Sequence, residues 1–568
     1  MKALLKYAIM MTNTNLSRRA EVTVLILIFV LALAPRLWCF FHNFLPEADA
    51  GNILEVGRNL AQGRGYVTYA KWDFFGEPGA VVHPEGNRQP LVPLVAAATF
   101  ALGANTAAAA RILTLIASLG ALALLYLLIR RWLGPGLALA GVAVAAVEPA
   151  FLWFSSRVQP EAYFALLFFA AIAVAGDFES ERPSLVRPII VGILLSLSYL
   201  CRLNGALLLV AYVAALFVAY RRKAFAPAGL ALLAFAAAAM PWWIRNARTF
   251  GDPLYSQAKY FIIAPNQEQV WAIKRYVPTW AGFFASYDFF GLLGRYVRGI
   301  WRALEPFLLG NLGTGEPFKG APFAAFVLLA AVAVPVLRRR RALLFPALAL
   351  LASIVGLAVC GWGLFRYFTP FYLLAIPLGF AGVMRAAGLF ERRRRWVTAA
   401  LVVILLLPLV KPLAKTLRYD DRVEYQRLAD VATWLNEHTG PDEVVVTWPR
   451  VVQLLYQYDR PTLYWPAGGI REILAILTNY NARYVVLEPP ALSLRPGLTA
   501  IWYKGYTGLK KVPTDIAGSE LTIIRVDYGG DAFKQVYRPE NADFIVVYEV
   551  DQAKLRSTVY GAYLTGIQ

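Results

Sequence analysis

The sequence predicts a polytopic α-helical membrane protein with about 11 transmembrane helices and a C-terminal extracytoplasmic α/β domain. Three observations support this prediction. Of the 568 residues, 58% are hydrophobic, and the mean hydropathy is +0.51. The apolar residues fall in runs close to the roughly 20 residues that a helix needs to cross a bilayer. Basic clusters separate the runs, at Arg130-Arg131, Arg221 to Lys223, Arg338 to Arg341 and Arg392 to Arg395.

The positive charge of the chain follows the membrane pattern. The net charge is +20, which in a soluble protein would suggest nucleic acid as a partner. Here the clusters lie in short loops between apolar runs, as in the cytoplasmic loops of membrane proteins. We therefore expect a lipid bilayer and no nucleic acid as partner. Cys39, Cys201 and Cys360 lie in or beside apolar runs and predict neither a disulfide framework nor a zinc site.

The first apolar run defines the orientation. Lys2, Lys6, Arg18 and Arg19 precede a run from Val22 to Phe41, which is too long for the core of a signal peptide. We predict an uncleaved span with a cytoplasmic N-terminus. The predicted spans are 22–41, 107–129, 133–150, 161–176, 187–201, 204–220, 226–244, 321–337, 342–360, 366–384 and 396–415.

Counting the spans from a cytoplasmic N-terminus assigns each loop to the cytoplasmic or the external side of the membrane. The loops predicted to be cytoplasmic all carry arginine, at 130, 177–186, 221–225, 338–341 and 385–395. The sequence thus divides into a transmembrane domain, 1–415, with external loops 42–106 and 245–320, and an extracytoplasmic α/β domain, 416–568, which would be periplasmic in a bacterial inner membrane. Shorter external loops are predicted at 151–160, 201–204 and 361–365.

The C-terminal domain shows both helical and strand patterns. Asp420-Asp421 can cap a helix in which Leu428, Val431, Ala432 and Leu435 follow helical spacing. A further helix is predicted at 471–479. Apolar runs predict strands at 444–446, 484–487, 522–526 and 544–550.

The segment 250–310 is rich in aromatic residues, among them Trp271, Trp280, Phe289 and Trp301. Such density is typical of helices that lie in the lipid headgroup layer. An aromatic core beneath a loop would give the same composition, and we expect interfacial helices.

The first external loop opens with a short amphipathic helix that carries Asp49 at its start. Ile53, Leu54, Gly57, Leu60 and Ala61 make one apolar face, and Gly63 and Gly65 end the helix. Aspartate is a favoured N-cap, so a purely structural role explains Asp49 as well. The functional interpretation is a carboxylate just outside the bilayer that accepts a proton from a hydroxyl group.

Glu161 is the second candidate carboxylate, at the external start of a span. Helix N-termini favour acids for structural reasons, but an ionisable residue at the end of a span is also a candidate site residue. Glu148, at the end of the preceding span, is a weaker candidate.

Four arginines are predicted on the external side, where basic residues in short loops are disfavoured. They can extend toward lipid headgroups. They can instead bind a phosphate that enters from the membrane, because a guanidinium group matches phosphate oxygens in a fork. These arginines are Arg88, Arg202, Arg245 and Arg366.

In this order, these segments resemble the bacterial branch of the protein O-mannosyltransferase and aminoarabinose (lipid A) transferase group, in the glycosyltransferase C superfold. The resemblance covers about residues 20–415. It rests on Asp49 with Gly63-Arg64-Gly65-Tyr66, on Arg88-Gln89-Pro90-Leu91, on Glu161, on Pro241 to Asn246 and on Arg366-Tyr367. Ala50 stands where the family usually has a glutamate, and Glu47 precedes Asp49 instead.

The resemblance implies a reaction at the outer face of a bacterial inner membrane. A polyprenyl-phosphate sugar would donate its glycosyl group to an envelope acceptor, a glycolipid, glycan or protein, with inversion. Asp49 would be the base, and Arg88 and Arg245 would hold the departing phosphate, with Arg202 and Arg366 as further candidates. Glu161 would orient the acceptor or share a divalent ion, Mg²⁺ or Mn²⁺, with Asp49.

Two alternatives remain open at this point. A transporter or flippase for a lipid-linked saccharide would place its charges near mid-membrane, often in two repeated halves, whereas the polar residues here gather at one predicted surface. A non-catalytic envelope assembly protein would present the C-terminal domain and would not need Asp49.

Overall fold

The structure is a computed structural model. It describes residues 17–46, 48–76, 79–104, 107–264, 268–274, 276–309, 324–333, 340–360, 365–389, 394–447, 457–467, 470–487, 512–513, 520–521, 532–539 and 545–557. The chain forms two compact units. Unit 1 comprises residues 1–44, 86–257 and 287–421, and unit 2 comprises residues 45–85, 258–286 and 422–568.

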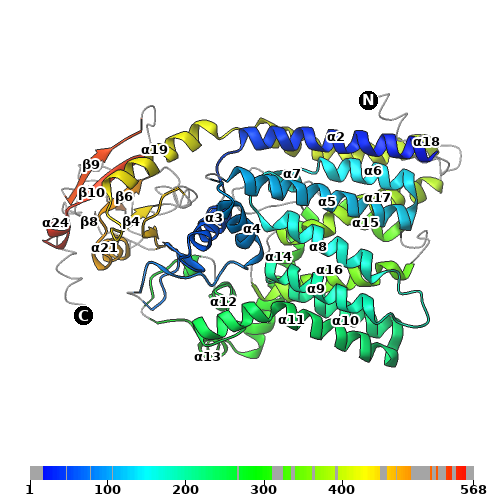
Figure 1. The fold of residues 1–568 in the computed structure, drawn as a ribbon, viewed down its shortest axis with the longest axis horizontal. Helices are drawn as coiled ribbons and strands as arrows, with labels where there is room; N and C mark the ends of the chain where they lie inside the picture. The colour runs from blue at the N-terminus through cyan, green and yellow to red at the C-terminus, as the bar shows by residue number, and fades with distance from the viewer. Residues whose placement is uncertain are drawn as a thin grey trace. The chain divides into compact units, whose positions relative to one another are not determined.

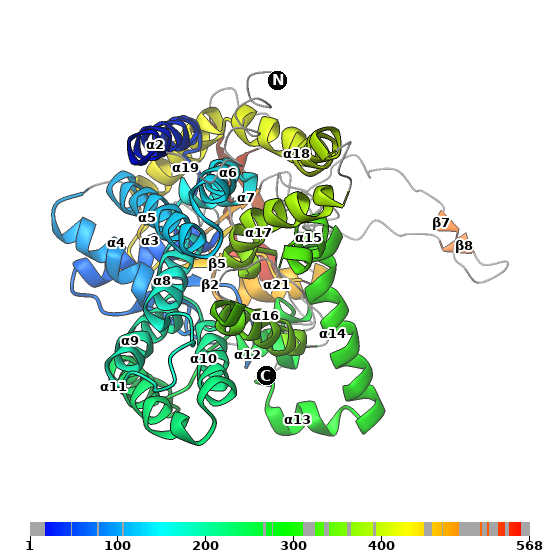
Figure 2. The same cartoon turned by 90° about the vertical axis from the view of Figure 1, so that its right-hand side faces the viewer.

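Unit 1 is helical, and each of the predicted spans contains a helix (Figure 1). Figure 2 looks roughly along the axes of α2, α5, α8 and α10. The helices that correspond to predicted spans are α2 (Arg18–His42), α5 (Ala108–Leu133), α6 (Pro135–Ala146), α8 (Pro160–Ala175), α9 (Val186–Cys201), α10 (Gly205–Tyr220), α11 (Phe225–Phe250), α15 (Ala324–Ala333), α16 (Leu344–Leu357), α17 (Thr369–Gly388) and α18 (Arg394–Arg418).

Several of these helices are long and apolar enough to cross a membrane. By length and hydropathy, five described stretches qualify, and a sixth does if α6 and α7 form one bent span. Helices of 16 residues such as α8 and α9 reach only about 24 Å. The prediction of a mostly helical, multi-pass membrane protein is confirmed.

The prediction for residues 133–150 and the loop 151–160 was wrong in its details. The helix α6 ends at Ala146, and α7 (Pro149–Ser155) follows at an angle of 65°. Glu148 causes the break locally. Its carboxylate accepts hydrogen bonds from the backbone N–H groups of Ala150 and Phe151 at 3.1 and 2.6 Å, so it caps a new helix that starts at Pro149.

Small residues let the helices of unit 1 approach closely. A Cβ atom on Gly192 of α9 would lie 2.3 Å from the Ala231 carbonyl oxygen of α11. A Cβ atom on Gly382 of α17 would lie 1.9 Å from the Leu329 carbonyl oxygen of α15. Such contacts are typical of membrane helices, which associate through tight packing.

The remaining elements of unit 1 connect or flank these helices. They are α4 (Leu91–Ala101), η1 (Arg221–Ala224), α14 (Phe289–Leu309), η4 (Arg340–Leu343), η5 (Ala358–Cys360) and η6 (Phe365–Phe368). On α14, exposed apolar side chains recur every four residues at Phe289, Leu293, Val297 and Trp301. The structure contains no membrane, so the interfacial position expected for this segment stays a prediction.

Unit 2 is built around a mixed six-stranded sheet in the order β2-β5-β4-β6-β10-β9. The first four strands are parallel, and β10 pairs antiparallel with both β6 and β9. The strands are β2 (Ala70–Lys71), β4 (Val445–Thr447), β5 (Thr462–Tyr464), β6 (Tyr484–Leu487), β9 (Phe533–Tyr537) and β10 (Val546–Val550).

Helices and short strand pairs complete unit 2. Its helical elements are α3 (Ala48–Ala61), α12 (Lys259–Ile263), η2 (Glu268–Val270), α13 (Trp280–Ala285), α19 (Arg422–His438), α21 (Ile470–Asn479) and α24 (Gln552–Ser557). The outer strand pairs are β1 (Val67–Thr68) with β3 (His83–Pro84), and β7 (Val512–Pro513) with β8 (Glu520–Leu521).

The predicted pattern of the C-terminal domain is largely confirmed. Helix α19 buries Leu428, Val431, Ala432 and Leu435, the four residues that the helical spacing selected. The strands predicted at 444–446 and 484–487 are β4 and β6, and the helix predicted at 471–479 is α21. The strand predicted at 544–550 contains β10, whereas the one predicted at 522–526 lies outside the described residues.

Candidate functional site

A buried charge cluster lies where several helices of unit 1 begin or end. Arg202, directly after α9, donates from Nη1 to Glu161 Oε1 at 2.5 Å. Arg366 Nε lies 3.6 Å from the same oxygen. The Tyr367 ring lies 4.1 Å from the Arg202 guanidinium carbon. We call these four residues the Glu161 cluster.

The local sequence fixes each member of the Glu161 cluster. Pro160 occupies the first turn of α8 and places Glu161 at the helix start. Arg202 caps α9 in a tight turn, closed by the hydrogen bond from Gly205 N–H to the Arg202 carbonyl at 2.8 Å. A Cβ atom on Gly205 would lie 2.4 Å from Tyr199 N, so this turn requires a glycine.

One carboxylate of this cluster faces two guanidinium groups. The side chains of Glu161, Arg202 and Arg366 are 0%, 6% and 18% exposed. Glu161 Oε2 is buried and accepts no hydrogen bond from the described residues. Guanidinium groups that are held at fixed positions can bind the oxygens of a phosphate.

A second pair of predicted site residues lies on adjoining segments of the same unit. The Arg245 guanidinium lies 4.9 Å from the ring centres of both Trp242 and Phe250 and donates to Asn246 Oδ1 at 2.9 Å. Phe250 stacks on Tyr255 with ring centres 4.0 Å apart. The chain that leads into Arg88 contacts this stack at Gly86, whose added Cβ would lie 2.7 Å from Tyr255.

The segments of Arg202 and Arg245 lie at one end of the helix array. Trp243 Nε1 on α11 donates to the Tyr199 hydroxyl near the end of α9 at 3.2 Å. The basic groups predicted to be cytoplasmic lie at other helix ends, with Arg130 and Arg131 in the last turn of α5 and Arg221 to Lys223 between α10 and α11. The sidedness of these residues in a membrane stays a prediction.

Asp49 belongs to unit 2, where it lies half-buried in the first turn of α3. The helix was predicted to be amphipathic with one apolar face, and in the structure its polar residues Asn52, Glu55, Arg58 and Asn59 are buried as well. Gly63 and Gly65 have φ of 75° and 86°, as expected for residues that end a helix. Glu47 lies outside the described residues.

The sequence analysis overlooked two buried arginines near the Glu161 cluster. Arg111 Nε donates to the Ser156 carbonyl at 2.8 Å. Arg157 lies 3.6 Å from Asp421 and over the Trp153 ring at 3.3 Å. Both are basic residues at span ends on the predicted external side. The same criterion selected the four arginines named in the sequence analysis. Asp421 accepts from the Phe44 backbone N–H at 2.5 Å.

The residues around Glu161 do not fit a divalent cation. Two guanidinium groups already neutralise this carboxylate, and they would repel a metal ion. Among the described residues, no group of three or more His, Cys, Asp or Glu side chains is arranged to hold a metal. We therefore assign no step of the reaction to Mg²⁺ or Mn²⁺.

Comparisons with known proteins find a family match over part of the chain. Residues 82–244 match the family described as dolichyl-phosphate-mannose-protein mannosyltransferase. This match contains Arg88, Glu161 and Arg202 and ends one residue before Arg245. A search of curated protein sequences finds no match.

Solved structures share the fold over most of the chain. The apo structure of ArnT from Cupriavidus metallidurans is similar with a TM-score of 0.55 and 12% identity, over 94% of this chain and 99% of that chain. ArnT from the same species bound to undecaprenyl phosphate gives 0.52 and 13%, over 92% and 97%. The archaeal oligosaccharyltransferase AglB from Archaeoglobus fulgidus, in complex with an inhibitory peptide and a dolichol-phosphate, gives 0.54 and 14%, over 82% and 69%.

The chain thus matches a mannosyltransferase family model over residues 82–244 and shares the fold of these membrane glycosyltransferase structures over most of its length. The resemblance stated from the sequence is confirmed. The shared architecture is an array of apolar helices joined to a mixed-sheet domain.

Proposed function

We propose that this protein transfers a sugar from a polyprenyl-phosphate donor to an envelope acceptor at the outer face of a bacterial inner membrane. The observation that carries the proposal is the Glu161 cluster, in which two guanidinium groups converge on one buried carboxylate at the ends of apolar helices. A phosphate on a membrane lipid reaches such a place without leaving the bilayer. ArnT from Cupriavidus metallidurans, which has been solved bound to undecaprenyl phosphate, has a similar fold.

The proposed reaction is a displacement at the anomeric carbon. An acceptor hydroxyl attacks this carbon as its bond to the phosphate oxygen breaks, and the bonding electrons pass to the phosphate. Polyprenyl phosphate leaves, the configuration inverts, and Asp49 takes the proton of the hydroxyl group. The role of Asp49 is supported by its position in the first external loop and by the family resemblance.

Arginines stabilise the charge that builds up on the departing phosphate. Arg366 and Arg202 supply guanidinium groups from the Glu161 cluster, and Arg88 and Arg245 supply others from neighbouring segments of unit 1. Glu161 holds Arg202 and Arg366 in place, since it contacts both. Donors that are fixed before the reaction favour the transition state because they need no reorganisation.

Reconstitution tests this function. The purified protein in liposomes, supplied with polyprenyl-phosphate sugars and an envelope extract, is expected to release free polyprenyl phosphate, detected by mass spectrometry. Asp49→Asn should lower the rate at least about 10²-fold, the lower range of a general base contribution. Full activity in this variant would exclude Asp49 as the base, and no release from any donor would reject the transferase proposal.

The acceptor requires a separate experiment. Comparison of envelope glycolipids and glycoproteins from cells with and without this gene, by mass spectrometry, should reveal one glycosylated species that disappears. Complementation with Asp49→Asn should fail to restore it if the chain is an enzyme. Restoration by this variant would favour a non-catalytic assembly role.

A further inference from the structure

The sheet of unit 2 takes in a strand from the far end of the sequence. The two residues of β2 come from the first external loop, yet they form the edge of the C-terminal sheet. Ala70 pairs with Thr462 and Lys71 with Leu463, in parallel register. The Thr462 backbone N–H donates to the Tyr69 carbonyl at 2.7 Å. The C-terminal sheet therefore includes the loop that carries Asp49.

Helix α3 is attached to this strand through its polar side chains. Glu55 Oε1 accepts from the Tyr69 backbone N–H at 2.5 Å, and Oε2 accepts from Thr68 Oγ1 at 2.9 Å and from Asn52 Nδ2 at 3.2 Å. Asn59 Nδ2 donates to the Val67 carbonyl at 3.0 Å. Asn52 and Glu55 lie one and two turns after Asp49, so the helix is fixed close to this residue.

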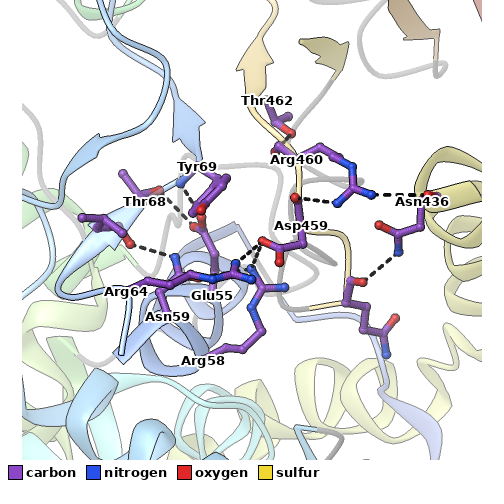
Figure 3. A network of polar contacts seen from close by, with 12 residues as sticks. Glu55, Arg58, Asn59, Arg64, Thr68, Tyr69, Asn436, Asp459, Arg460 and Thr462 are labelled. Atoms are coloured by element: carbon purple, nitrogen blue, oxygen red, sulfur yellow. Dashed lines mark hydrogen bonds and ion pairs between the residues drawn. The ribbon is translucent and has the colours of Figure 1, made fainter. Parts of the chain in front are cut away.

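A second attachment joins α3 directly to the C-terminal part of unit 2. Arg58 Nη2 and Arg64 Nη1 both donate to Asp459 Oδ1, at 3.0 and 2.5 Å (Figure 3). The Arg58 side chain is 9% exposed and the Asp459 side chain 25%. We call Arg58, Arg64 and Asp459 the Asp459 clasp. It connects residues 401 positions apart in the sequence.

The residue that follows Asp459 anchors the clasp within its own domain. Arg460 Nε donates to the Thr439 carbonyl at 3.2 Å. Its Nη2 donates to the Asn436 carbonyl at 3.4 Å, at the end of α19 (Figure 3). Asn436 in turn donates to the Gln457 carbonyl at 3.0 Å. Asp459 is thus held between α19 and β5, and its carboxylate presents a fixed acceptor to α3.

We infer that the C-terminal domain acts as a positioning scaffold for the Asp49 helix, and that Asp459 is the positioning residue that sets the orientation of α3. This inference rests on the proposed role of Asp49 as the base. According to this inference, the C-terminal domain supports the reaction by positioning α3, and these residues of the domain do not contact the substrate. A displacement of about 1 Å at a reacting group can lower the rate about 10²-fold.

The test compares Asp459→Asn with Asp442→Asn, an exposed aspartate of the same unit. In the reconstituted assay, Asp459→Asn should lower kcat about 10- to 100-fold and leave the donor KM within about twofold, because only the base is displaced. Hydrogen exchange of the backbone amides of residues 50–61 should become faster in the same variant. Asp442→Asn should change neither quantity.

Two results would overturn the inference. One is a wild-type kcat in Asp459→Asn, with or without faster exchange in α3. The other is a lower kcat with unchanged exchange in α3, which would mean that Asp459 acts elsewhere. If Asp459→Asn fails to fold, Arg64→Gln replaces it in the comparison. The Arg64 side chain is 36% exposed, and its loss removes one of the two ion pairs of Asp459.

The controls separate this inference from the proposed function. A wild-type rate in Asp49→Asn rejects the base assignment and with it the inference. An inactive Asp49→Asn together with a fully active Asp459→Asn rejects the positioning role alone.

Discussion

The Glu161 cluster and the Asp459 clasp each bring two guanidinium groups to one carboxylate oxygen, but the carboxylate is fully buried in the first and 25% exposed in the second. In the clasp, two guanidinium groups meet Asp459, and the neighbouring Glu55 accepts three hydrogen bonds from α3 and the segment that follows it. In the Glu161 cluster, one carboxylate faces two guanidinium groups, and Glu161 Oε2 accepts no hydrogen bond from the described residues.

This difference in burial distinguishes a structural contact from a candidate binding site. The Asp459 clasp joins two segments of unit 2 at a partly exposed position. In the Glu161 cluster the carboxylate is fully buried and the guanidinium groups are mostly buried, and guanidinium groups bind phosphate oxygens. These buried guanidinium groups are the physical basis for the proposed lipid-phosphate site.

The largest expected effect comes from removal of the shared carboxylate of the Glu161 cluster. Glu161→Ala leaves Arg202 and Arg366 without their common partner, and breaking a buried ion pair costs about 3–5 kcal/mol. Sugar transfer should fall about 10³-fold, and the thermal midpoint of the detergent-solubilised protein should drop. Glu179→Ala, an exposed loop glutamate, is the control. Wild-type transfer by Glu161→Ala would remove Glu161 from the account.

The pH dependence of the free energy of unfolding tests the role of Glu55, which lies beside the Asp459 clasp in unit 2. Burial raises the pKa of Glu55 from 4.5 to about 7, although its hydrogen bonds with Tyr69 and Thr68 oppose this shift. A raised folded-state pKa contributes stability that is full below pH 4.5 and is lost as the pH rises through 7. Wild-type stability should fall over this range by up to a few kcal/mol.

Glu55→Gln tests the source of that pH dependence. The amide keeps an acceptor for the Tyr69 N–H and cannot ionise, so its unfolding curve should change less with pH between about 5 and 8. Chemical unfolding followed by tryptophan fluorescence at several pH values measures the difference. Equal pH dependence in the two proteins would contradict the assignment to Glu55.

The smallest expected effect concerns the aromatic partner of Arg202. Tyr367→Leu removes the ring that lies 4.1 Å from the guanidinium carbon, a contact worth about 0.5–2 kcal/mol. The donor KM should rise about two- to thirtyfold with kcat nearly unchanged. Tyr367→Phe keeps the ring and should behave as wild type. A loss of activity in Tyr367→Phe would assign the hydroxyl group a role that this account does not include.

Hydropathy and helical spacing were sufficient to predict most of the helices of the fold. Each predicted span contains a helix, and the buried face of α19 follows from the spacing of its apolar residues alone. The break at Glu148 was missed because continuous apolar composition conceals a local cap. The edge strand β2 was missed because two residues carry no periodic pattern, and its partner lies about 390 positions away.

The candidate site could be predicted only in part. Glu161, Arg202 and Arg366 were selected because they are ionisable residues at span ends on the predicted external side. The structure brings these three together. Their pairing could not be predicted, because it depends on how α8, α9 and η6 meet in space. The same signal should have included Arg111 and Arg157, which the structure places beside Ser156 and Asp421. The assignment of Asp49 remains a prediction.

Binding of the lipid phosphate tests the central claim most directly. Native mass spectrometry or titration in nanodiscs would measure the Kd of polyprenyl phosphate for the wild type, for Arg366→Ala and for Arg222→Ala, an exposed arginine between α10 and α11. We expect the Kd to rise at least about tenfold in Arg366→Ala, as for loss of a charge-assisted contact, and to stay unchanged in Arg222→Ala. The same Kd in all three proteins would contradict the claim that the Glu161 cluster holds the phosphate.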